Sequence, residues 1–152
     1  MNDAVGGVKV KVLQNISYPD HNVKLHKGDK VTLNGQEAYY YLRGRDVEKY
    51  DSASDRLRRE EQYIVAYMDR LKALTADDPS IVMGVYNSIE DYLVTSVDFS
   101  SLINELMGYD FNDDDMYTVP GKTVQGDEYE EYHVDEDAMQ DMIMSVFYTP
   151  VS

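Results

Sequence analysis

"LHKGDKVTLNGQEAYYYLRGRD", residues 25–46, is the stretch that decides the fold. A glycine turn leads into a short strand at 31–33, and Asn34 then begins a helix. Glu37, three residues later, completes a capping box, in which each side chain accepts a hydrogen bond from the other residue's backbone N–H. Gly44 interrupts this helix, as a C-terminal glycine does. The segment therefore predicts a strand followed by a short, capped helix.

The flanking segments extend this pattern on both sides. Valines alternate with lysines over residues 8–12, which is the period-2 pattern of a half-buried strand. Ser52 with Asp55 three residues later predicts the start of a long helix over 53–76. Apolar residues recur along this helix at helical spacing, so we expect it to bury Leu57, Ile64, Met68 and Leu71.

The rest of the chain predicts further helices and two short strands. A proline opens a helix over 79–93, and a shorter helix follows at 100–107. "MYTVPGKT" (116–123) predicts a strand that ends in a Pro-Gly turn. Residues 131–148 predict a brief strand and an amphipathic helix. Helices and strands are mixed, which indicates an α/β or α+β fold.

Composition limits the class of protein. The chain has 152 residues, of which 43% are hydrophobic and 14 are tyrosines, and this fits a globular domain with a real core. No repeat or low-complexity linker divides residues 1–152, so we expect a single domain. No apolar run reaches the roughly 18 residues of a membrane span, and the first residues lack the plan of a signal peptide. The absence of cysteine excludes disulfides and thiolate sites.

Charge is distributed unevenly along the chain, whose formal net charge is -15. Residues 1–76 contain 13 Lys and Arg against 11 Asp and Glu, a net of +2. Residues 77–152 contain one Lys against 18 acids, a net of -17. Because the acidic part would repel a phosphate backbone, nucleic acid is not an expected partner.

Five of the six arginines nevertheless lie between Arg43 and Arg59. Arg56 and Arg59 are three residues apart on one face of the predicted helix, and Gln62 continues that face. Arg43 and Arg45 would share one side of an extended segment. Guanidinium groups bind phosphate through paired hydrogen bonds, so the cluster predicts a site for a small anion. The alternative is a solvated ion network with the neighbouring carboxylates.

Metal-binding patterns are weak in this sequence. The three histidines are scattered and form no paired motif. "DFNDDDMY" (110–117) places Asp110, Asn112 and Asp114 at positions one, three and five of a calcium loop. However, Asp115 stands where an EF-hand needs glycine, and the glutamate of position twelve is missing. We therefore expect a solvated turn there and no metal site.

The order of these segments resembles the C-terminal half of the catalytic domain of the LytR-CpsA-Psr family. Residues 3–12, "DAVGGVKVKV", are similar to the family's GGV strand, and residues 25–46 to its G…LNG-x-x-A…Y-x-R-x-R segment. Residues 54–72, "SDRLRREEQYIVAYMDRLK", resemble its R-x-x-R-Q helix start, and residues 118–148 resemble the tail of some members. Each motif is weak alone, but the ordered set is specific and covers essentially the whole chain.

The resemblance implies a fold and an activity. Members of this family are phosphotransferases of the bacterial cell envelope, best known in Gram-positive bacteria, that act on the extracytoplasmic face of the membrane. They move a glycopolymer, such as wall teichoic acid or capsule, from an undecaprenyl-pyrophosphate lipid to peptidoglycan. Magnesium and several arginines hold the pyrophosphate, and the polyprenyl tail lies in an apolar tunnel. The implied fold is a fragment of an α/β/α sandwich, with a mixed sheet flanked by helices.

The resemblance also assigns residues to the pyrophosphate site, namely Arg43 and Arg45 of R-x-R, Arg56 and Arg59 of R-x-x-R-Q, and Gln62 just beyond. Glu60 departs from the family, which usually has glutamine there, and places a negative charge near the expected phosphates. The resemblance assigns no catalytic residue and no metal ligand within this chain.

The family's N-terminal half has no counterpart in residues 1–152. That half carries the magnesium-binding aspartates, another arginine and the first strands, and the membrane anchor lies upstream of it. We therefore expect this chain to begin near the midpoint of the family domain, to hold no magnesium and to be inactive alone. Such a half-domain would expose strand edges and apolar surface, so we expect it to form homo-oligomers.

Two other functions compete with the role in a transferase. One is a non-catalytic, truncated α/β domain that binds a polyanion or a partner protein. The other is transcriptional attenuation, which the family's older name suggests. The charge balance argues against attenuation, because only Arg70 and Lys72 follow the arginine cluster on the long helix.

Overall fold

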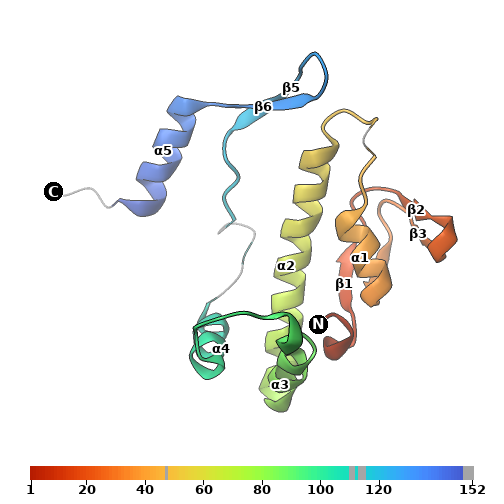
Figure 1. Cartoon of the computed structure of the whole chain (residues 1–152), viewed down its shortest axis with the longest axis vertical. Helices are drawn as coiled ribbons and strands as arrows, with labels where there is room; N and C mark the ends of the chain where they lie inside the picture. The colour runs from red at the N-terminus through yellow and green to blue at the C-terminus, as the bar shows by residue number, and fades with distance from the viewer. Residues whose placement is uncertain (47, 110–111, 113–115, 149–152) are drawn as a thin grey trace.

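The computed structural model describes residues 1–46, 48–109, 112 and 116–148. Figure 1 shows its elements, which are in chain order the short 3₁₀ helix η1 (Asp3–Val5), β1 (Val8–Lys11), β2 (Ile16–Tyr18), η2 (Pro19–His21), β3 (Val23–Leu25), β4 (Lys30–Leu33), α1 (Gly35–Arg43), α2 (Ser52–Asp77), α3 (Ser80–Asn87), η3 (Glu90–Tyr92), α4 (Phe99–Gly108), β5 (Gly121–Gln125), β6 (Glu130–Val134) and α5 (Glu136–Phe147).

β1 and β4 pair side by side in antiparallel fashion, with Val8 opposite Leu33 and Val10 opposite Val31. The valines of β1 are buried and its lysines exposed, as the alternating sequence predicts. Gly7 precedes β1 with φ of 86°, and a Cβ there would lie 2.8 Å from the carbonyl oxygen of Leu33. Glycine is therefore required where the chain enters this pair.

The capping box of α1 is confirmed. The side chain of Asn34 accepts from the N–H of Glu37 at 2.9 Å, and the N–H of Asn34 donates to Oε2 of Glu37 at 2.9 Å. α1 ends at Arg43, and the N–H of Gly44 donates to the carbonyl of Tyr40. The local sequence thus fixes both ends of this helix.

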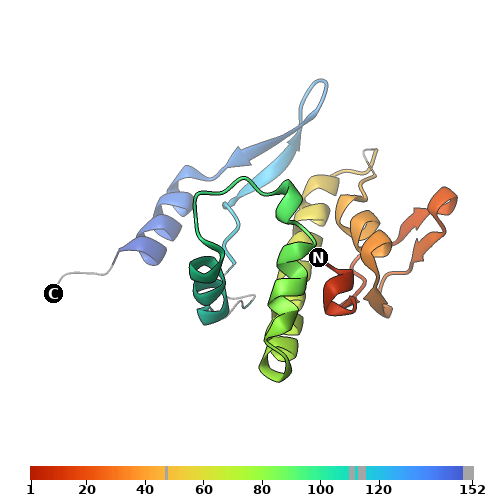
Figure 2. The same ribbon diagram turned by 60° about the horizontal axis from the view of Figure 1, so that its bottom comes forward.

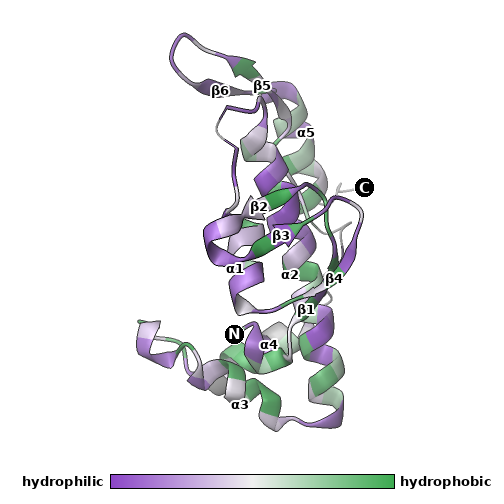
Figure 3. Ribbon diagram, turned by 90° about the vertical axis from the view of Figure 1, so that its right-hand side faces the viewer, coloured by the Kyte–Doolittle hydropathy of each residue, from purple (hydrophilic) through white to green (hydrophobic). Residues whose placement is uncertain are grey.

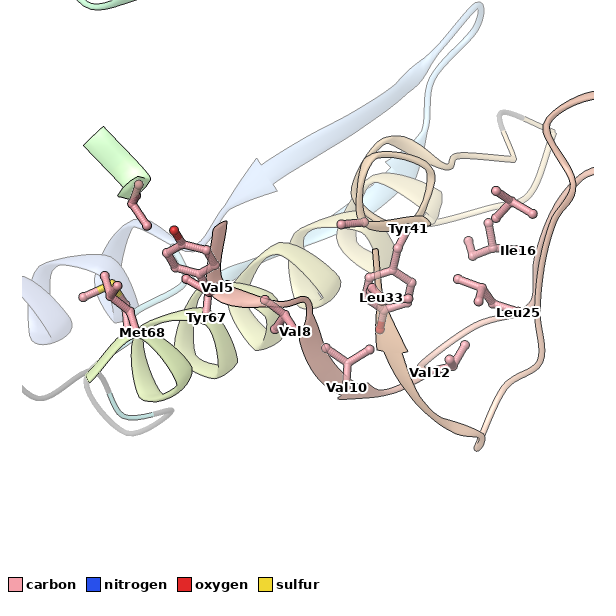
Figure 4. Packing of buried hydrophobic residues seen from close by; sticks show 14 residues of the cluster. Val5, Val8, Val10, Val12, Ile16, Leu25, Leu33, Tyr41, Tyr67 and Met68 are labelled. Carbon is pink, nitrogen blue, oxygen red and sulfur yellow. The ribbon is translucent and has the colours of Figure 1, made fainter. Parts of the chain in front are cut away.

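One hydrophobic cluster joins β1, β2, β3 and β4 to α1, α2 and α3. Figure 4 shows its side chains converging between β1, β4 and α2. α2 contributes Tyr67, Met68 and Leu71, and it packs against β1, α1 and α3. The expectation that Leu57 and Ile64 are buried is wrong, since they are 41% and 43% exposed.

The phase of α2 explains that error. Its covered face carries Ser52, Arg59, Tyr63, Tyr67 and Leu71, most of them four residues apart, and all but the half-buried Tyr63 are buried. At 100° per residue, Leu57 lies about 200° around the helix from Arg59. The prediction placed the buried face of α2 by its apolar residues, but part of that face is polar.

The α/β class is confirmed, and the structure gives the pairing of its strands. Within the described residues the strands form three separate two-stranded antiparallel sheets, β1–β4, β2–β3 and β5–β6, rather than one mixed sheet. β2 and β3 were not predicted. α3 ends at Asn87, short of the expected 93. β5 begins at the glycine of the Pro-Gly pair, whereas the expected strand ended there.

The C-terminal elements lie apart from this cluster. In Figures 1 and 2, the β5–β6 hairpin lies beyond the N-terminal end of α2, and α5 lies on the side of α2 away from β1 and α1. None of the described residues of β5, β6 or α5 belongs to the buried core. Figure 3 shows much of the hydrophobic colour on α3 and α4. Among the described residues, no helix combines the length and apolar character needed to cross a bilayer.

Candidate functional site

A pocket of about 480 Å³ opens where the α1–α2 connection meets the segment that follows β1. Three residues of α2 line it, Ser52, Asp55 and Arg59, whose spacing of three and four places them on one face of the helix. The remaining lining comes from residues 14–18, Lys27, 44–46 and Lys49. The pocket therefore gathers segments that are up to 45 residues apart in sequence.

Basic side chains outnumber acidic ones in this pocket. Among the described lining residues, Lys27, Arg45, Lys49 and Arg59 are basic, and Asp46 and Asp55 are acidic. This excess stands out in a chain of net charge -15. A concave site with an excess of cations attracts anions more strongly than a flat surface does.

Arg59 forms the back of the pocket and is 3% exposed. Its Nε donates to the carbonyl oxygen of Tyr41 at 2.7 Å, its Nη1 donates to Oε1 of Gln14 at 2.8 Å, and its Nη2 donates to the carbonyl oxygen of Gly44. Tyr41 and Gly44 belong to the end of α1, where helix carbonyls lack intrahelical partners. Arg59 therefore fastens the end of α1 to α2 and to the segment after β1.

The charge of Arg59 is not neutralised at close range. No carboxylate of the described residues lies within ion-pair distance of its guanidinium, although Asp55 lines the same pocket. Burial lowers the pKa of Arg59, because the low-dielectric surroundings disfavour the charged form. A guanidinium that is solvated by neutral oxygens contributes a fixed positive potential to the pocket.

Arg45 and Lys49 are the more accessible cations. Arg45 donates from Nε to Oγ of Ser52 at 3.0 Å, and its side chain is 36% exposed. Lys49 forms an ion pair with Asp55, which Arg58 also approaches at 3.4 Å. Both cations can turn donors toward a ligand, whereas the donors of Arg59 are committed to the protein.

The residues assigned by sequence thus divide into two groups. Arg45 and Arg59 line the pocket together, while Arg43, Arg56 and Gln62 lie outside its lining.

Each residue outside the pocket has its own surroundings. Arg43 is exposed at the end of α1, and it makes no hydrogen bond or ion pair with any residue that the structure describes. Arg56 pairs with Glu60 on the same helix at 3.5 Å. Gln62 joins two elements, since it accepts from Oη of Tyr41 at 2.8 Å and donates to the carbonyl of Lys11 at 3.0 Å. Of the four arginines, the structure therefore brings Arg45 and Arg59 to the pocket and leaves Arg43 and Arg56 outside its lining.

Sequence reasoning missed Lys27 and Lys49. Lys49 lies in the α1–α2 connection, between the pair Arg43 and Arg45 and the pair Arg56 and Arg59. Its position in the sequence could therefore have indicated that it belongs to the same site. Lys27 comes from the turn between β3 and β4, and only the pairing of β3 with β2 and of β4 with β1 brings it to the pocket. No local pattern could have indicated it.

Metal-ligating groups do not gather at this pocket. Among the residues that the structure describes, no three His, Asp or Glu side chains are placed to hold a metal ion. Asp55 is occupied by Lys49 and Arg58. The aspartates of the rejected calcium loop, Asp110, Asp114 and Asp115, lie outside the described residues.

Comparisons with known proteins support the resemblance. The model of the LytR_cpsA_psr family matches residues 1–146. Protein gbs0355 from Streptococcus agalactiae has a similar structure, with a TM-score of 0.69 and 19% identity over 92% of this chain and 49% of that chain. TagV from B. subtilis gives a TM-score of 0.64 and 21% identity over 98% of this chain and 60% of that one.

These two likenesses concern the fold alone. The chain spans 49% and 60% of the two solved chains, so each contains a large part with no counterpart here. No curated protein matches the sequence.

Proposed function

The chain belongs to the LytR-CpsA-Psr family, and from this membership we propose that it forms part of a phosphotransferase of the bacterial cell envelope. The enzyme moves a glycopolymer from an undecaprenyl-pyrophosphate lipid to peptidoglycan on the extracytoplasmic face of the membrane. In this proposal the pocket around Arg45 is one wall of the pyrophosphate site. Its partners are the lipid-linked glycopolymer and peptidoglycan.

The observation that carries the proposal is the group of cations at one pocket. Arg45 and Lys49 present accessible donors, and Arg59 adds a fixed charge behind them. Transfer of a phosphoryl group from a diphosphate develops negative charge on the leaving phosphate. Preorganised cationic donors stabilise that charge without having to reorganise during the reaction. Arginine suits this role because its guanidinium stays charged and contacts two phosphate oxygens at once.

The family's magnesium does not fit the described residues of this chain. They place no three carboxylate or histidine side chains together, and Asp55, an acid of the pocket, is already paired with two cations. The chain spans about half of one solved relative, and we propose that transfer activity also needs residues from the remainder of the family domain.

Inorganic pyrophosphate tests the site directly. Calorimetric titration should give a Kd on the order of 1 mM for the unaltered chain, and the affinity should fall as salt is added. Arg45→Ala should weaken binding about tenfold or more, because it removes charge-assisted hydrogen bonds. Arg45→Lys should also weaken it, since an ammonium lacks the planar fork.

Two controls sharpen this experiment. Arg58→Ala removes the same charge from a residue that pairs with Asp55 but does not line the pocket, and it should change the affinity by no more than about twofold. Arg43→Ala distinguishes the family motif from the geometry of the pocket. The motif predicts that this variant loses affinity for pyrophosphate, whereas the pocket predicts that it keeps it. If Arg45→Ala binds pyrophosphate as well as the unaltered chain, the pocket is not the site.

A second candidate is a non-catalytic domain that binds a polyanion or a partner protein. The observation that favours it is the group of four basic side chains that lines the pocket, which would attract a polyanion whether or not any transfer takes place. Its discriminating measurement is transfer from a polyprenyl-pyrophosphate donor, which this candidate would not support even when the rest of the family domain is supplied.

A further inference from the structure

Glu130 of β6 reaches the rim of the pocket and holds its accessible arginine. Its Oε2 lies 3.8 Å from Nη2 of Arg45, and its Oε1 accepts from the N–H of Asp51 at 2.7 Å. The side chain of Glu130 is 18% exposed, whereas that of its neighbour Glu131 is 62% exposed. Glu130 is therefore the acid of the hairpin that turns toward the pocket.

The other contacts of the hairpin converge on the same connection. Oγ1 of Thr123 donates to Oδ1 of Asp51 at 2.7 Å, and Oη of Tyr50 donates to the carbonyl of Thr123 at 2.5 Å. Hydrogen bonds from Ser54 and from Thr123 lower the pKa of Asp51, because they favour its carboxylate. Asp51 itself has φ of 60°, a left-handed conformation that is uncommon for residues other than glycine, although aspartate adopts it more readily than most.

The attachment of the hairpin is polar throughout this set of contacts. No described residue of β5 or β6 is part of the buried core, so little apolar burial reinforces the hydrogen bonds and the ion pair. The ion pair between Arg45 and Glu130 is long, at 3.8 Å, and open to solvent on the side of Arg45, so we expect it to be weak and sensitive to salt. The hairpin can therefore leave the rim without disturbing β1, β4 or α2.

An incoming anion and Glu130 would compete for one partner. Both present oxygen atoms to Arg45, but pyrophosphate carries several negative charges, whereas Glu130 carries one. Pyrophosphate can also reach Lys27 and Lys49, which line the same pocket. Once the anion neutralises Arg45, the carboxylate of Glu130 faces a negative ligand and is repelled.

We infer that the β5–β6 hairpin is an electrostatic latch, in which Glu130 occupies Arg45 until a diphosphate ligand displaces it and frees the hairpin. This inference rests on the proposed pyrophosphate site, and it adds to that site a built-in competitor. Glu130 thus sets a threshold of ligand charge, so that a singly charged anion does not open the rim and a diphosphate does.

The test combines Glu130→Gln with Glu131→Gln as a matched control. Each variant removes one negative charge from β6, but only Glu130 faces Arg45. Calorimetry with inorganic pyrophosphate measures affinity, and amide ¹⁵N relaxation of Thr123 and Glu130 measures the mobility of the hairpin. Glu130→Gln should bind pyrophosphate about two- to fivefold more tightly, with a mobile hairpin before ligand is added. Glu131→Gln should match the unaltered chain in both measurements.

Thr123→Val is a second variant that weakens the attachment without changing any charge. It should also increase hairpin mobility and affinity, because Glu130 is then held less firmly against Arg45. Pyrophosphate that binds the unaltered chain while the hairpin stays fixed would overturn the latch and leave the site intact. Equal or weaker binding by Glu130→Gln would overturn it as well. If neither the unaltered chain nor Glu130→Gln binds pyrophosphate, the site itself fails and the latch fails with it.

Discussion

Arg59 is a charged side chain in a position that folded domains usually give to an apolar residue. It is tolerated there because its donors meet three oxygen acceptors, the carbonyls of Tyr41 and Gly44 and the side chain of Gln14. The family motif treats Arg59 as a ligand contact, and the structure gives it an organising role as well. Loss of Arg59 should therefore affect the free energy of unfolding more than it affects the binding of an anion.

Arg59→Met tests this role. The substitution keeps the length of the side chain but leaves the carbonyls of Tyr41 and Gly44 without their donor. The free energy of unfolding should fall by about 3 kcal/mol or more, because each buried acceptor that loses its partner costs roughly 1 to 3 kcal/mol. Urea denaturation followed by circular dichroism measures the change.

Arg58→Ala is the control for Arg59→Met, since Arg58 is exposed and its change should stay within about 0.5 kcal/mol. Equal stability of Arg59→Met and the unaltered chain would show that the buried hydrogen bonds contribute little.

At the scale of elements, α1 depends on its capping box. Asn34→Ala removes the acceptor for the N–H of Glu37 and should lower the free energy of unfolding by about 1 kcal/mol. Gln36→Ala, an exposed change in the same turn, should stay within about 0.5 kcal/mol. Thermal or urea unfolding of the two variants side by side measures the difference. Similar stability for both would mean that the cap is not a main support of α1.

Elements with local signals were the ones that the sequence predicted well. β1 follows from alternating valines, and the bounds of α1 follow from Asn34 and Gly44. β2 and β3 are three residues each, too short for their alternation to stand out, so only their pairing defines them. α2 was predicted as a helix, but its first residue was taken for its cap. Asp51 precedes the helix instead, and Ser52 is buried within it.

The candidate site shows the same limit. Sequence predicted an anion site from its arginines, and Arg45 and Arg59 do meet at one pocket. The direction of each arginine could not be predicted, because one face of α2 buries a guanidinium and another exposes leucine and isoleucine. Lys27 reaches the pocket through tertiary pairing alone. The pyrophosphate role of the five assigned residues stays a prediction.

At the scale of the whole molecule, apolar side chains remain exposed on elements outside the core. Leu57 and Ile64 lie on the uncovered face of α2, and Phe147 of α5 is 76% exposed. Because exposed apolar surface favours association while a net charge of -15 opposes it, we expect self-association that rises with protein concentration and with salt.

Sedimentation velocity over a concentration series measures this association. Ile64→Glu should shift the chain toward monomer, whereas Ala73→Glu, an exposed change further along α2, should alter it less. A monomer at every concentration and salt level would argue against the expected homo-oligomer.

The position of the core along the chain also bears on synthesis. The last buried residue of the hydrophobic cluster is Val85, so the residues that bury one another are made before β5, β6 and α5. Chains generally fold from the N-terminal side while they are being synthesised. The β1–β4 and β2–β3 pairs and α2 can therefore close around their core while the ribosome is still adding β5, β6 and α5, and these later elements join a nucleus that has already formed.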